Sequence, residues 1–393
     1  MTNAQLHYEW GSRAAIPTFL GKDADGRPVA ELWMGTHHQG PSSVEEAVGL
    51  LTPLAAVSGE LPFLMKVLAA DKPLSLQVHP GRALADVGFR EEEAAGIPLG
   101  APERSYKDAN HKPEMAYALT TFDTLVGFRP TAEILRVLAA IDTPLTKSLG
   151  EDLRANPGFA GIVRLVERLL TEEVAAAEIT EVVDACRVLA SSSIDIKRAY
   201  ATAVEIAEHF PEDVGIVISL FLNRVTLQPG EAAFLGAGVI HAHLSGMCIE
   251  IMAASDNVLR AGLTTKHINP RGLIRCLDKG MSRVARVTPE QWGFSTEVFR
   301  PETVEDFALS VTQCSFAEPD GTVLPDLGRR ILLCTGGEVT VLNERGQSLD
   351  LERGDSLYAG PDDGSLRIIG IGEVAQAYEP TKRTIHSHLA PIR

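Results

Sequence analysis

Residues 227–262 read LQPGEAAFLGAGVIHAHLSGMCIEIMAASDNVLRAG, and this stretch decides the fold class. Short apolar runs rich in β-prone residues alternate in it with Gly and Pro, which is typical of strands joined by turns. Gly236 and Gly238 allow a tight turn just before His241, and His243 follows two residues later. Because residues two apart on a strand share a face, both rings are expected on one side of a sheet.

The first 130 residues show the same texture. Segments such as ELWMG, FLMKVLAA and PLSLQVHP are short, apolar and bounded by turn residues, so they are predicted to be strands and loops. Two helices are expected in this part, over residues 44–57 and 81–95.

A different pattern occupies residues 131–222, which are rich in Ala, Leu and Glu. Ile162, Val166 and Leu169 recur at i, i+4 and i+7, which predicts a helix with one face in a core. Four or five helices fit the segment, with breaks near residues 156–158, near 191–193 and at Pro211. Since strand-like sequence lies on both sides, we interpret this block as a packed helical insertion without chemistry of its own.

The C-terminal part returns to strands and turns. Pairs such as Asp320-Gly321 and Asp363-Gly364 separate short β-prone runs, a spacing that suits an antiparallel sandwich. The sequence thus predicts a mainly β protein with an α insertion. The expected division is a catalytic β domain of residues 1–130 plus 223–290, an inserted helical domain of 131–222, and a C-terminal β-sandwich domain of 291–393. The last is expected to be structural, with His386 and His388 in a solvated tail.

Composition limits the kinds of partner. The 393-residue chain has a net charge of −16, which argues against nucleic acid and against an anionic membrane surface, because both need a basic footprint. Its five cysteines are scattered without a CxxC pair, so a reduced compartment is expected. The N-terminus lacks the pattern of a signal peptide, and no apolar run approaches the ~20 residues of a membrane span. We therefore expect a cytoplasmic protein, with a monomer as the default state.

Four side chains that can bind a metal lie in three separated segments. Gln77 and His79 stand in LSLQVHP, Glu114 in NHKPEMAYAL, and His241 in the stretch quoted first. A set of nitrogen and oxygen ligands with room for one more describes a catalytic metal site, and it suits zinc, with manganese or cobalt also acceptable. Arg260 follows in SDNVLRAGLT, and cations beside such a site indicate an anionic substrate.

The run from Gly236 to Glu250 loosely resembles the first cupin motif, although its gap between histidine and glutamate is longer than usual. This resemblance implies a cupin-type jelly roll for the catalytic domain. It also leaves open a cupin-type oxygenase that binds iron through His241, His243 and Glu250.

A closer resemblance rests on several ordered motifs. YEWGSRAAI at 8–16, AELWMGTHHQGPS at 30–42, LSLQVHP at 74–80, NHKPEMAYAL at 110–119, LQPGEAAFLGAG at 227–238 and SDNVLRAGLT at 255–264 resemble type I mannose-6-phosphate isomerases, also called phosphomannose isomerases. The match covers most of the first 275 residues in the family's order and fades toward the C-terminus. It implies an aldose–ketose isomerase that interconverts mannose 6-phosphate and fructose 6-phosphate through a cis-enediol.

Carried over by position, the resemblance implies one zinc ion per chain bound by Gln77, His79, Glu114 and His241, and it makes Arg260 the active-site arginine. Two positions depart from the family pattern. His243 stands where the family usually has tyrosine, so it can fill that place, add a ligand or replace a hydroxyl hydrogen bond. His38 replaces the proline of GTHP.

Further substrate contacts are expected from Lys112, Lys266, Glu250 and Trp10. Arg271 is another candidate for the phosphate, and Glu31, Trp33 and His37 lie in motifs that the family places near its site. The residue that shuttles the proton stays open among Glu250, His243 and Lys112. Besides the isomerase and the oxygenase, a non-catalytic sugar-phosphate sensor is a third hypothesis, and the complete ligand set counts against it.

Overall fold

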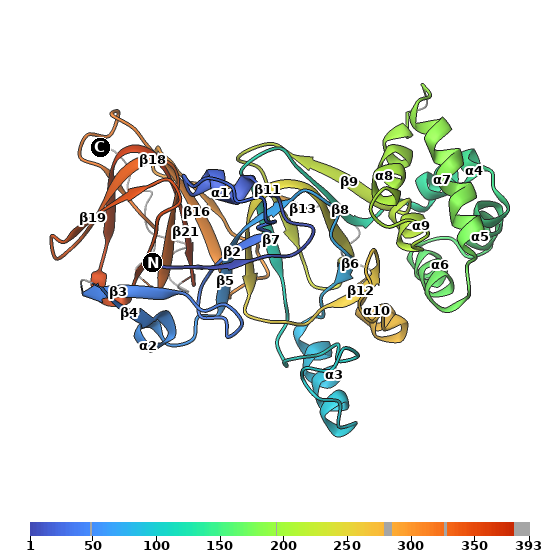
Figure 1. The fold of residues 1–393 in the computed structure, drawn as a ribbon, viewed down its shortest axis with the longest axis horizontal. Coiled ribbons are helices and arrows are strands. Elements are labelled where there is room, and N and C mark those ends of the chain that lie inside the picture. The colour runs from blue at the N-terminus through green and yellow to red at the C-terminus, as the bar shows by residue number, and fades with distance from the viewer. Residues whose placement is uncertain (48, 194, 279–284, 326–327, 381–393) are drawn as a thin grey trace, which may run out of the picture.

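The structure is a computed structural model of the 393-residue chain, and it describes all residues except 48, 194, 279–284, 326–327 and 381–393. His386 and His388 therefore lie outside the described residues. Figure 1 shows a β part at the centre, helices at one end of the longest axis and a second β part at the other end. The chain is mainly β with a helical segment between its strands, as the sequence predicts.

In the described ranges, the central β part holds an antiparallel sheet of eleven strands with the path β1-β2-β5-β11-β7-β10-β13, and β6, β8, β9 and β12 lie off this path. Its strands are β1 (Ala4–Leu6), β2 (Glu31–Met34), β5 (Phe63–Ala70), β6 (Leu76–Val78), β7 (Glu114–Ala118), β8 (Phe122–Phe128), β9 (Leu222–Leu227), β10 (Ala232–Leu235), β11 (His241–Ala253), β12 (Leu259–Gly262) and β13 (Ala285–Val287).

Strand β11 joins the two halves of this sheet. Its first residues pair with β6 and β8, whereas residues 246–253 pair with β5 and, in part, with β7. The register shifts between His243 and Ser245, and Gly246 then takes a φ of 105°. A β-bulge of this kind bends a strand, and only glycine adopts such a φ without strain. A Cβ at Gly246 would lie 2.3 Å from the carbonyl oxygen of Thr121, so the close approach also requires glycine.

The helical segment lies between β8 and β9. Its helices are α4 (Thr131–Ile141), α5 (Pro144–Ala155), α6 (Phe159–Thr171), α7 (Ala176–Ala190), α8 (Lys197–Ala207) and α9 (Gly215–Ser219). This makes six helices among the described residues of the block, where four or five were expected. The predicted breaks are present, and two further breaks fall at Asp142-Thr143 and at residues 172–175. Thr143 caps α5 by accepting a hydrogen bond from the backbone N–H of Thr146, and Pro144 occupies the first helical turn.

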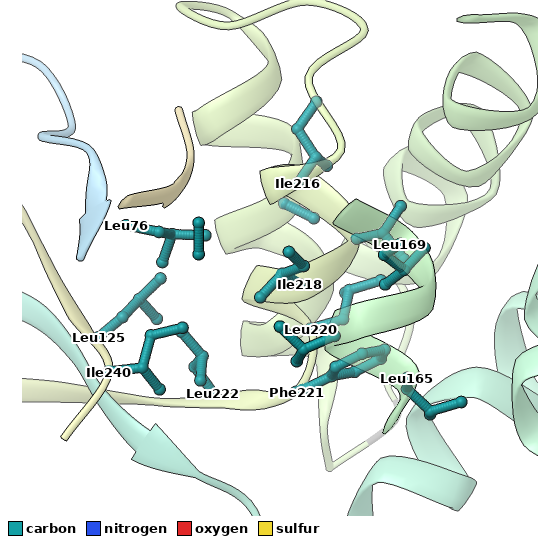
Figure 2. Close-up of a cluster of buried hydrophobic side chains, with 14 of the residues drawn as sticks. Leu76, Leu125, Leu165, Leu169, Ile216, Ile218, Leu220, Phe221, Leu222 and Ile240 are labelled. Atoms are coloured by element: carbon teal, nitrogen blue, oxygen red, sulfur yellow. The ribbon is translucent and has the colours of Figure 1, made fainter. Parts of the chain in front are cut away.

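One hydrophobic core joins the helices to the central β part. Figure 2 shows Leu165 and Leu169 of α6 near Ile218 and Phe221, with Leu76 of β6 on the opposite side of the cluster. All of these side chains are buried. The strand that carries Gln77 therefore packs against the helical block through the side chain of Leu76.

The second β part is an antiparallel sheet of eight strands in the part of the chain that the structure describes. Its strands are β14 (Glu290–Trp292), β15 (Thr296–Phe299), β16 (Ala308–Cys314), β17 (Thr322–Val323), β18 (Arg330–Asn343), β19 (Ser348–Glu352), β20 (Ser356–Ala359) and β21 (Leu366–Tyr378). A common core with the central part includes Tyr117 of β7 and Phe299 of β15, whose ring centroids are 5.2 Å apart. The two β parts therefore pack through apolar side chains.

The helix expected at 44–57 is wrong over most of its length. The segment forms β3 (Ser43–Ala47), β4 (Leu50–Pro53) and a short helix α2 (Leu54–Ser58). Gly49, with a φ of 82°, lies in the turn between the two strands, so the chain folds back there as a hairpin. The second expected helix is confirmed as α3 (Arg82–Ala94), and the shorter helices α1 (Ala15–Phe19) and α10 (Pro270–Cys276) are also present. Within the described residues, every helix is too short or too polar to cross a bilayer.

Candidate active site

Three of the predicted metal ligands meet in the interior of the central β part. His79 directly follows β6, Glu114 begins β7 and His241 begins β11. Their ligand atoms all lie within 4.8 Å of one another, and the three residues are 1%, 3% and 0% exposed. Three strands far apart in sequence therefore bring two imidazoles and one carboxylate to one buried point.

Hydrogen bonds fix the tautomer of both imidazoles. The Nδ1 atoms of His79 and His241 lie 2.8 Å and 2.9 Å from the carbonyl oxygens of Asn257 and Val239. A carbonyl only accepts, so each Nδ1 carries the proton and each Nε2 keeps a free lone pair. Both Nε2 atoms lie within 3.3 Å of Glu114 Oε2, yet neither has a partner with hydrogen-bond geometry among the described residues. Two buried lone pairs facing a carboxylate form a site suited to a cation.

The protonation states agree with this arrangement. Burial lowers the pKa of His79 to about 4, so the ring is neutral near pH 7. Burial alone would raise the pKa of Glu114, but its interactions with His79 and Lys112 lower the pKa well below its usual value. Neutral imidazoles and an ionised carboxylate are the forms that bind divalent metals.

Gln77 and Arg260 adjoin this cluster through strand register. Gln77 lies opposite His241 in the pairing of β6 with β11 and opposite Arg260 in the pairing of β6 with β12. Both residues line a cavity of about 820 Å³, which also has Glu114 in its wall. The fourth predicted ligand and the predicted arginine therefore lie at the same cavity as the buried cluster.

Cationic side chains gather around the cavity. Lys112 Nζ lies 3.2 Å from Glu114 Oε1, while Lys107 and Lys266 line the wall with Arg260. Burial lowers the pKa of Lys266, and the charges of Arg260 and Lys107 lower it further. Positive charges gathered at one wall attract an anion, although the whole chain is strongly acidic.

A buried ion-pair network crosses one wall of the cavity, and its central residue was missed from the sequence. Lys66 Nζ lies 3.4 Å from Glu31 Oε1 and 3.2 Å from Glu250 Oε2. Burial alone would raise the pKa of Glu250, but the charge of Lys66 lowers it to about 2. The signal was present in the segment FLMKVLAA, because a lysine within an apolar strand must find charged partners when the strand is buried.

His243 belongs to this network and not to the cluster of His79, Glu114 and His241. Its Nε2 lies 3.1 Å from Glu250 Oε1 and its Nδ1 lies 3.1 Å from Thr124 Oγ1. The iron site expected for an oxygenase, with His241, His243 and Glu250 around one ion, is not among the possible metal groups of the described residues. Of the three hypotheses for His243, its position agrees with the one in which the ring forms hydrogen bonds.

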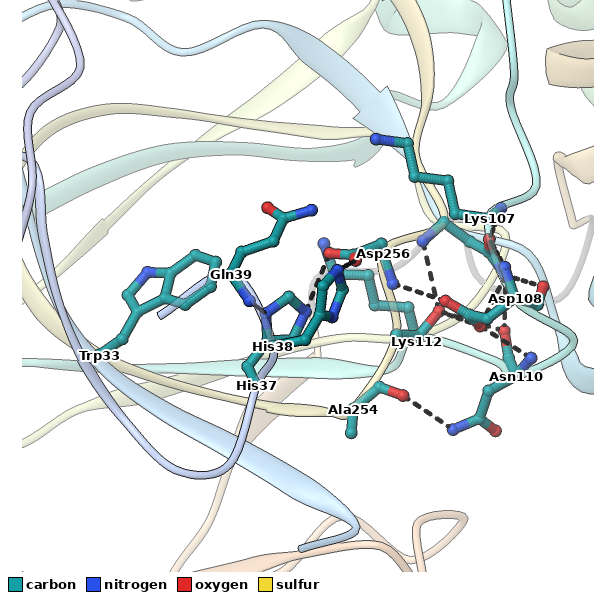
Figure 3. A network of polar contacts seen from close by, with 12 residues as sticks. Trp33, His37, His38, Gln39, Lys107, Asp108, Asn110, Lys112, Ala254 and Asp256 are labelled. Carbon is teal, nitrogen blue, oxygen red and sulfur yellow. Dashed lines mark hydrogen bonds and ion pairs between the residues drawn. The ribbon is translucent and has the colours of Figure 1, made fainter. Parts of the chain in front are cut away.

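A second polar group lies at the cavity on the side of Trp33. His37 Nε2 is 3.1 Å from Asp256 Oδ1, and the Asp256 carboxylate also faces His38 at 3.9 Å (Figure 3). Gln39 donates its backbone N–H to His37 Nδ1, so the ring proton is on Nε2 and is donated to Asp256. His37 and Asp256 line the cavity, whereas the His38 side chain is 74% exposed. Asp256 stands in the SDNVLRAGLT motif, from which the sequence predicts only Arg260 as a site residue.

The remaining predicted contacts divide into two groups. Trp10 lines the cavity and stacks on Tyr8, with ring centroids 5.6 Å apart. Arg271, by contrast, is exposed and does not line the cavity. The helical block, expected to be without chemistry, contributes residues 208–210, just beyond α8, to the cavity wall.

Comparisons with known proteins agree with this geometry. A family model described as phosphomannose isomerase type I, catalytic domain, matches residues 1–131. The mannose-6-phosphate isomerase of Escherichia coli strain K12 is 35% identical over 400 residues, which cover 96% of this chain and 98% of that protein. The human mannose-6-phosphate isomerase is 32% identical over 408 residues, covering 92% of each. The matched region thus extends beyond residue 275 into the C-terminal part.

The fold is shared with solved structures as well. The mannose 6-phosphate isomerase of Salmonella typhimurium, solved with its substrate fructose 6-phosphate and zinc bound, superimposes with a TM-score of 0.85 at 34% identity, covering 97% of this chain and 98% of that one. Identity above 30% over nearly the full length, together with the shared fold, shows that this chain belongs to the type I mannose-6-phosphate isomerase family.

Proposed function

We propose that this protein is a zinc-dependent aldose–ketose isomerase that interconverts mannose 6-phosphate and fructose 6-phosphate through a cis-enediol. The observation that carries the proposal is the pair of buried Nε2 lone pairs of His79 and His241 that face Glu114 at the wall of a cationic cavity. Relatives named mannose-6-phosphate isomerase over nearly the full length support it. We place the enzyme in the cytoplasm as a monomer.

The proposed ligands are Gln77, His79, Glu114 and His241, which would hold one zinc ion per chain. The residues fit the ion because two neutral imidazoles, one carboxylate and one neutral amide leave a divalent cation with net positive charge. Such an ion, when bound, supplies Lewis-acid polarisation of the substrate oxygens. Lys112, which pairs with Glu114, adds positive charge beside the same oxygens.

The phosphate group is assigned to the cations at the cavity wall. Arg260 keeps its charge at any working pH and offers a fork of N–H donors that matches a phosphate. Lys266 and Lys107 lie at the same cavity, and their mutual repulsion is relieved when an anion binds. Trp10 and Glu250 are assigned to the wall that surrounds the sugar.

The proton that moves between C1 and C2 requires a base at the cavity. Both carboxylate oxygens of Glu250 already have a partner, Oε2 with Lys66 Nζ and Oε1 with His243 Nε2. Asp256 is hydrogen-bonded to His37, and a carboxylate paired with an imidazole is an arrangement that general acid–base catalysis uses. We assign proton transfer to the Asp256–His37 pair, with Lys112 holding the developing negative charge.

The domain division follows the predicted boundaries. We propose a cupin-type jelly roll for residues 1–130 and 223–290, an inserted helical domain for 131–222, and a C-terminal sandwich for 291–393. The switch of β11 between two sets of partners supports a closed sandwich for the first of these. The antiparallel pairing of β14 to β21 supports the last.

The function is tested by a coupled assay for fructose 6-phosphate formed from mannose 6-phosphate, run with and without a chelator. Zinc-loaded protein should turn over, chelation should abolish the activity, and added zinc should restore it. Arg260→Ala should lose most of the activity while retaining zinc. If folded, zinc-loaded wild type shows no turnover, the isomerase assignment fails.

A further inference from the structure

The loop of residues 107–113 holds Lys112 against the buried cluster. Lys112 is 8% exposed, and its Nζ lies 3.2 Å from Glu114 Oε1. Figure 3 shows Lys112 beside Asp256, with Asp108 and Asn110 of the loop to their right. The position of this ammonium therefore depends on how the loop backbone is anchored.

One anchor comes from the central β part. Asn257 is fully buried, accepts the backbone N–H of Lys107 at 2.7 Å and donates Nδ2 to the carbonyl oxygens of Asp108 at 2.8 Å and Asn110 at 2.9 Å. These bonds fix the loop up to Asn110. None of these hydrogen bonds involves the side chain of His111, which lies between Asn110 and Lys112 in the sequence.

The second anchor comes from the C-terminal part. His111 Nε2 lies 2.7 Å from Oδ2 of Asp306, in the segment between β15 and β16. Arg82 Nη2 lies 2.7 Å from the same nitrogen and 3.5 Å from Asp306 Oδ1. One ring nitrogen cannot both donate to the carboxylate and accept from the guanidinium. Because an ionised carboxylate only accepts, the proton belongs on Nε2 and is donated to Asp306, while Arg82 pairs with Asp306.

Burial favours this pairing. The side chains of His111 and Asp306 are 17% and 12% exposed, so water competes little for either group. Burial alone would raise the pKa of Asp306, but the hydrogen bond with His111 lowers it, so the carboxylate is ionised. A charge-assisted bond of this length is stronger than a neutral one.

We infer that Asp306 is a positioning residue for the isomerase reaction: through His111 it fixes the loop that places Lys112 beside Glu114. The C-terminal part, expected to be structural, thereby completes the active site. The inference rests on the proposed function. Asp306 touches neither the substrate cavity nor the metal ligands, so it acts only through the loop.

The first test compares Asp306→Ala with Glu305→Ala, which removes the same charge from an exposed neighbour. A displacement of about 1 Å at a reacting group can lower a rate by up to about 100-fold. Asp306→Ala should lower kcat about 10-fold and change KM less than about 3-fold, because Arg260 and Lys266 lie outside the loop. Zinc content and melting temperature should stay near the wild-type values. Glu305→Ala should match the wild type.

Conservative rescue and a double-mutant cycle separate positioning from a general packing role. Asp306→Asn keeps an oxygen that accepts from His111 and should recover most of kcat. Asp306→Ala introduced into His111→Ala should cause little further loss. The inference is overturned if Asp306→Ala has wild-type kcat, if its loss follows loss of zinc, or if the loss persists unchanged in the His111→Ala background.

Amide hydrogen exchange supplies a readout that does not need turnover. In the zinc-loaded protein, Asp306→Ala should raise exchange over residues 107–112, and Glu305→Ala should not. Wild type without turnover would remove the proposed function and with it any catalytic role of Asp306, while the exchange data would still show whether Asp306 holds the loop. Active wild type with unchanged exchange in Asp306→Ala would overturn the inference and leave the function intact.

Discussion

Replacing Lys66 by methionine tests the buried network at the cavity wall. Methionine keeps the volume of the lysine stem but removes the charge that lies 3.4 Å from Glu31 and 3.2 Å from Glu250. Both carboxylates stay buried, so each loses the cation that compensates its desolvation. We expect the variant to fold with strongly reduced stability at neutral pH.

The size of the loss follows from burial. Removing one partner of a buried ion pair costs about 3–5 kcal/mol. An unfolding entropy of about 2.1 cal/mol/K per residue amounts to roughly 0.8 kcal/mol/K for 393 residues. If the chain unfolds as one unit, the melting temperature should fall by about 4–6 °C, and a smaller cooperative unit gives a larger fall.

The pH dependence has a definite sign. In the wild type Lys66 holds the pKa of Glu250 at about 2, below its usual 4.5, so the pair stabilises above pH 4.5 and this contribution is lost as the pH falls toward 2. In Lys66→Met, burial without this cation raises the pKa of Glu250. The folded variant then gains protons that the unfolded chain does not bind, so its deficit should shrink as the pH is lowered from 7 to about 5.

Thermal and urea unfolding at both pH values measure this deficit, with zinc saturating throughout. Lys72→Met is the matched control, because Lys72 lines the same cavity but is exposed. Its stability should lie within about 0.5 kcal/mol of the wild type. A deficit below about 1 kcal/mol for Lys66→Met, or one that does not change with pH, would refute the reasoning from buried charge.

Further predictions concern the strand switch, the ligand histidines and the arginine. Gly246→Ala places a Cβ 2.3 Å from the carbonyl oxygen of Thr121 at a φ of 105°, so we expect a loss of about 1–3 kcal/mol in urea unfolding, with Gly230→Ala, which meets no neighbour, as the milder comparison. The metal-free protein should lose stability as the pH falls from about 6.5 to 4, since His79 binds a proton only when unfolded, and His79→Gln should flatten that slope. Arg260→Lys should keep zinc but lower kcat/KM about 10- to 100-fold, because an ammonium cannot form the two parallel bonds of a guanidinium; unchanged kinetics would remove Arg260 from phosphate binding.

Much of the site could be predicted because its residues stand in local motifs. Gln77, His79, Glu114 and His241 each lie in a short strand-like segment, and the resemblance to the family placed them in one set. The structure brings His79, Glu114 and His241 together, and Gln77 follows by register with His241. Local pattern also located the helical block, since its stripes recur at helical spacing over many turns.

Other features depend on long-range packing that no local pattern records. Lys66 is 184 residues from Glu250 in sequence, and their pairing follows only from the register of β5 against β11. His111 and Asp306 are 195 residues apart and meet across the packing of two β parts. In residues 44–57 the chain forms a hairpin and the start of a short helix instead of one helix, and Gly49 lies in the turn between the two strands.

The oxygenase hypothesis is not supported, because one irregularity in β11 changes which side chains the histidines contact. His241 and His243 are two residues apart, so a regular strand would place both rings on one face, whereas Glu250, nine residues beyond His241, would lie roughly 30 Å from it along the strand. The register shift after His243 and the turn of the chain at Gly246 change the partners of β11 from β8 to β5. His243 therefore reaches Glu250, while His241 faces Glu114. The bend after His243 thus brings this histidine to the ion-pair network, whereas His241 lies beside Glu114 and His79, and the spacing of the motif alone assigns both histidines to the same ion.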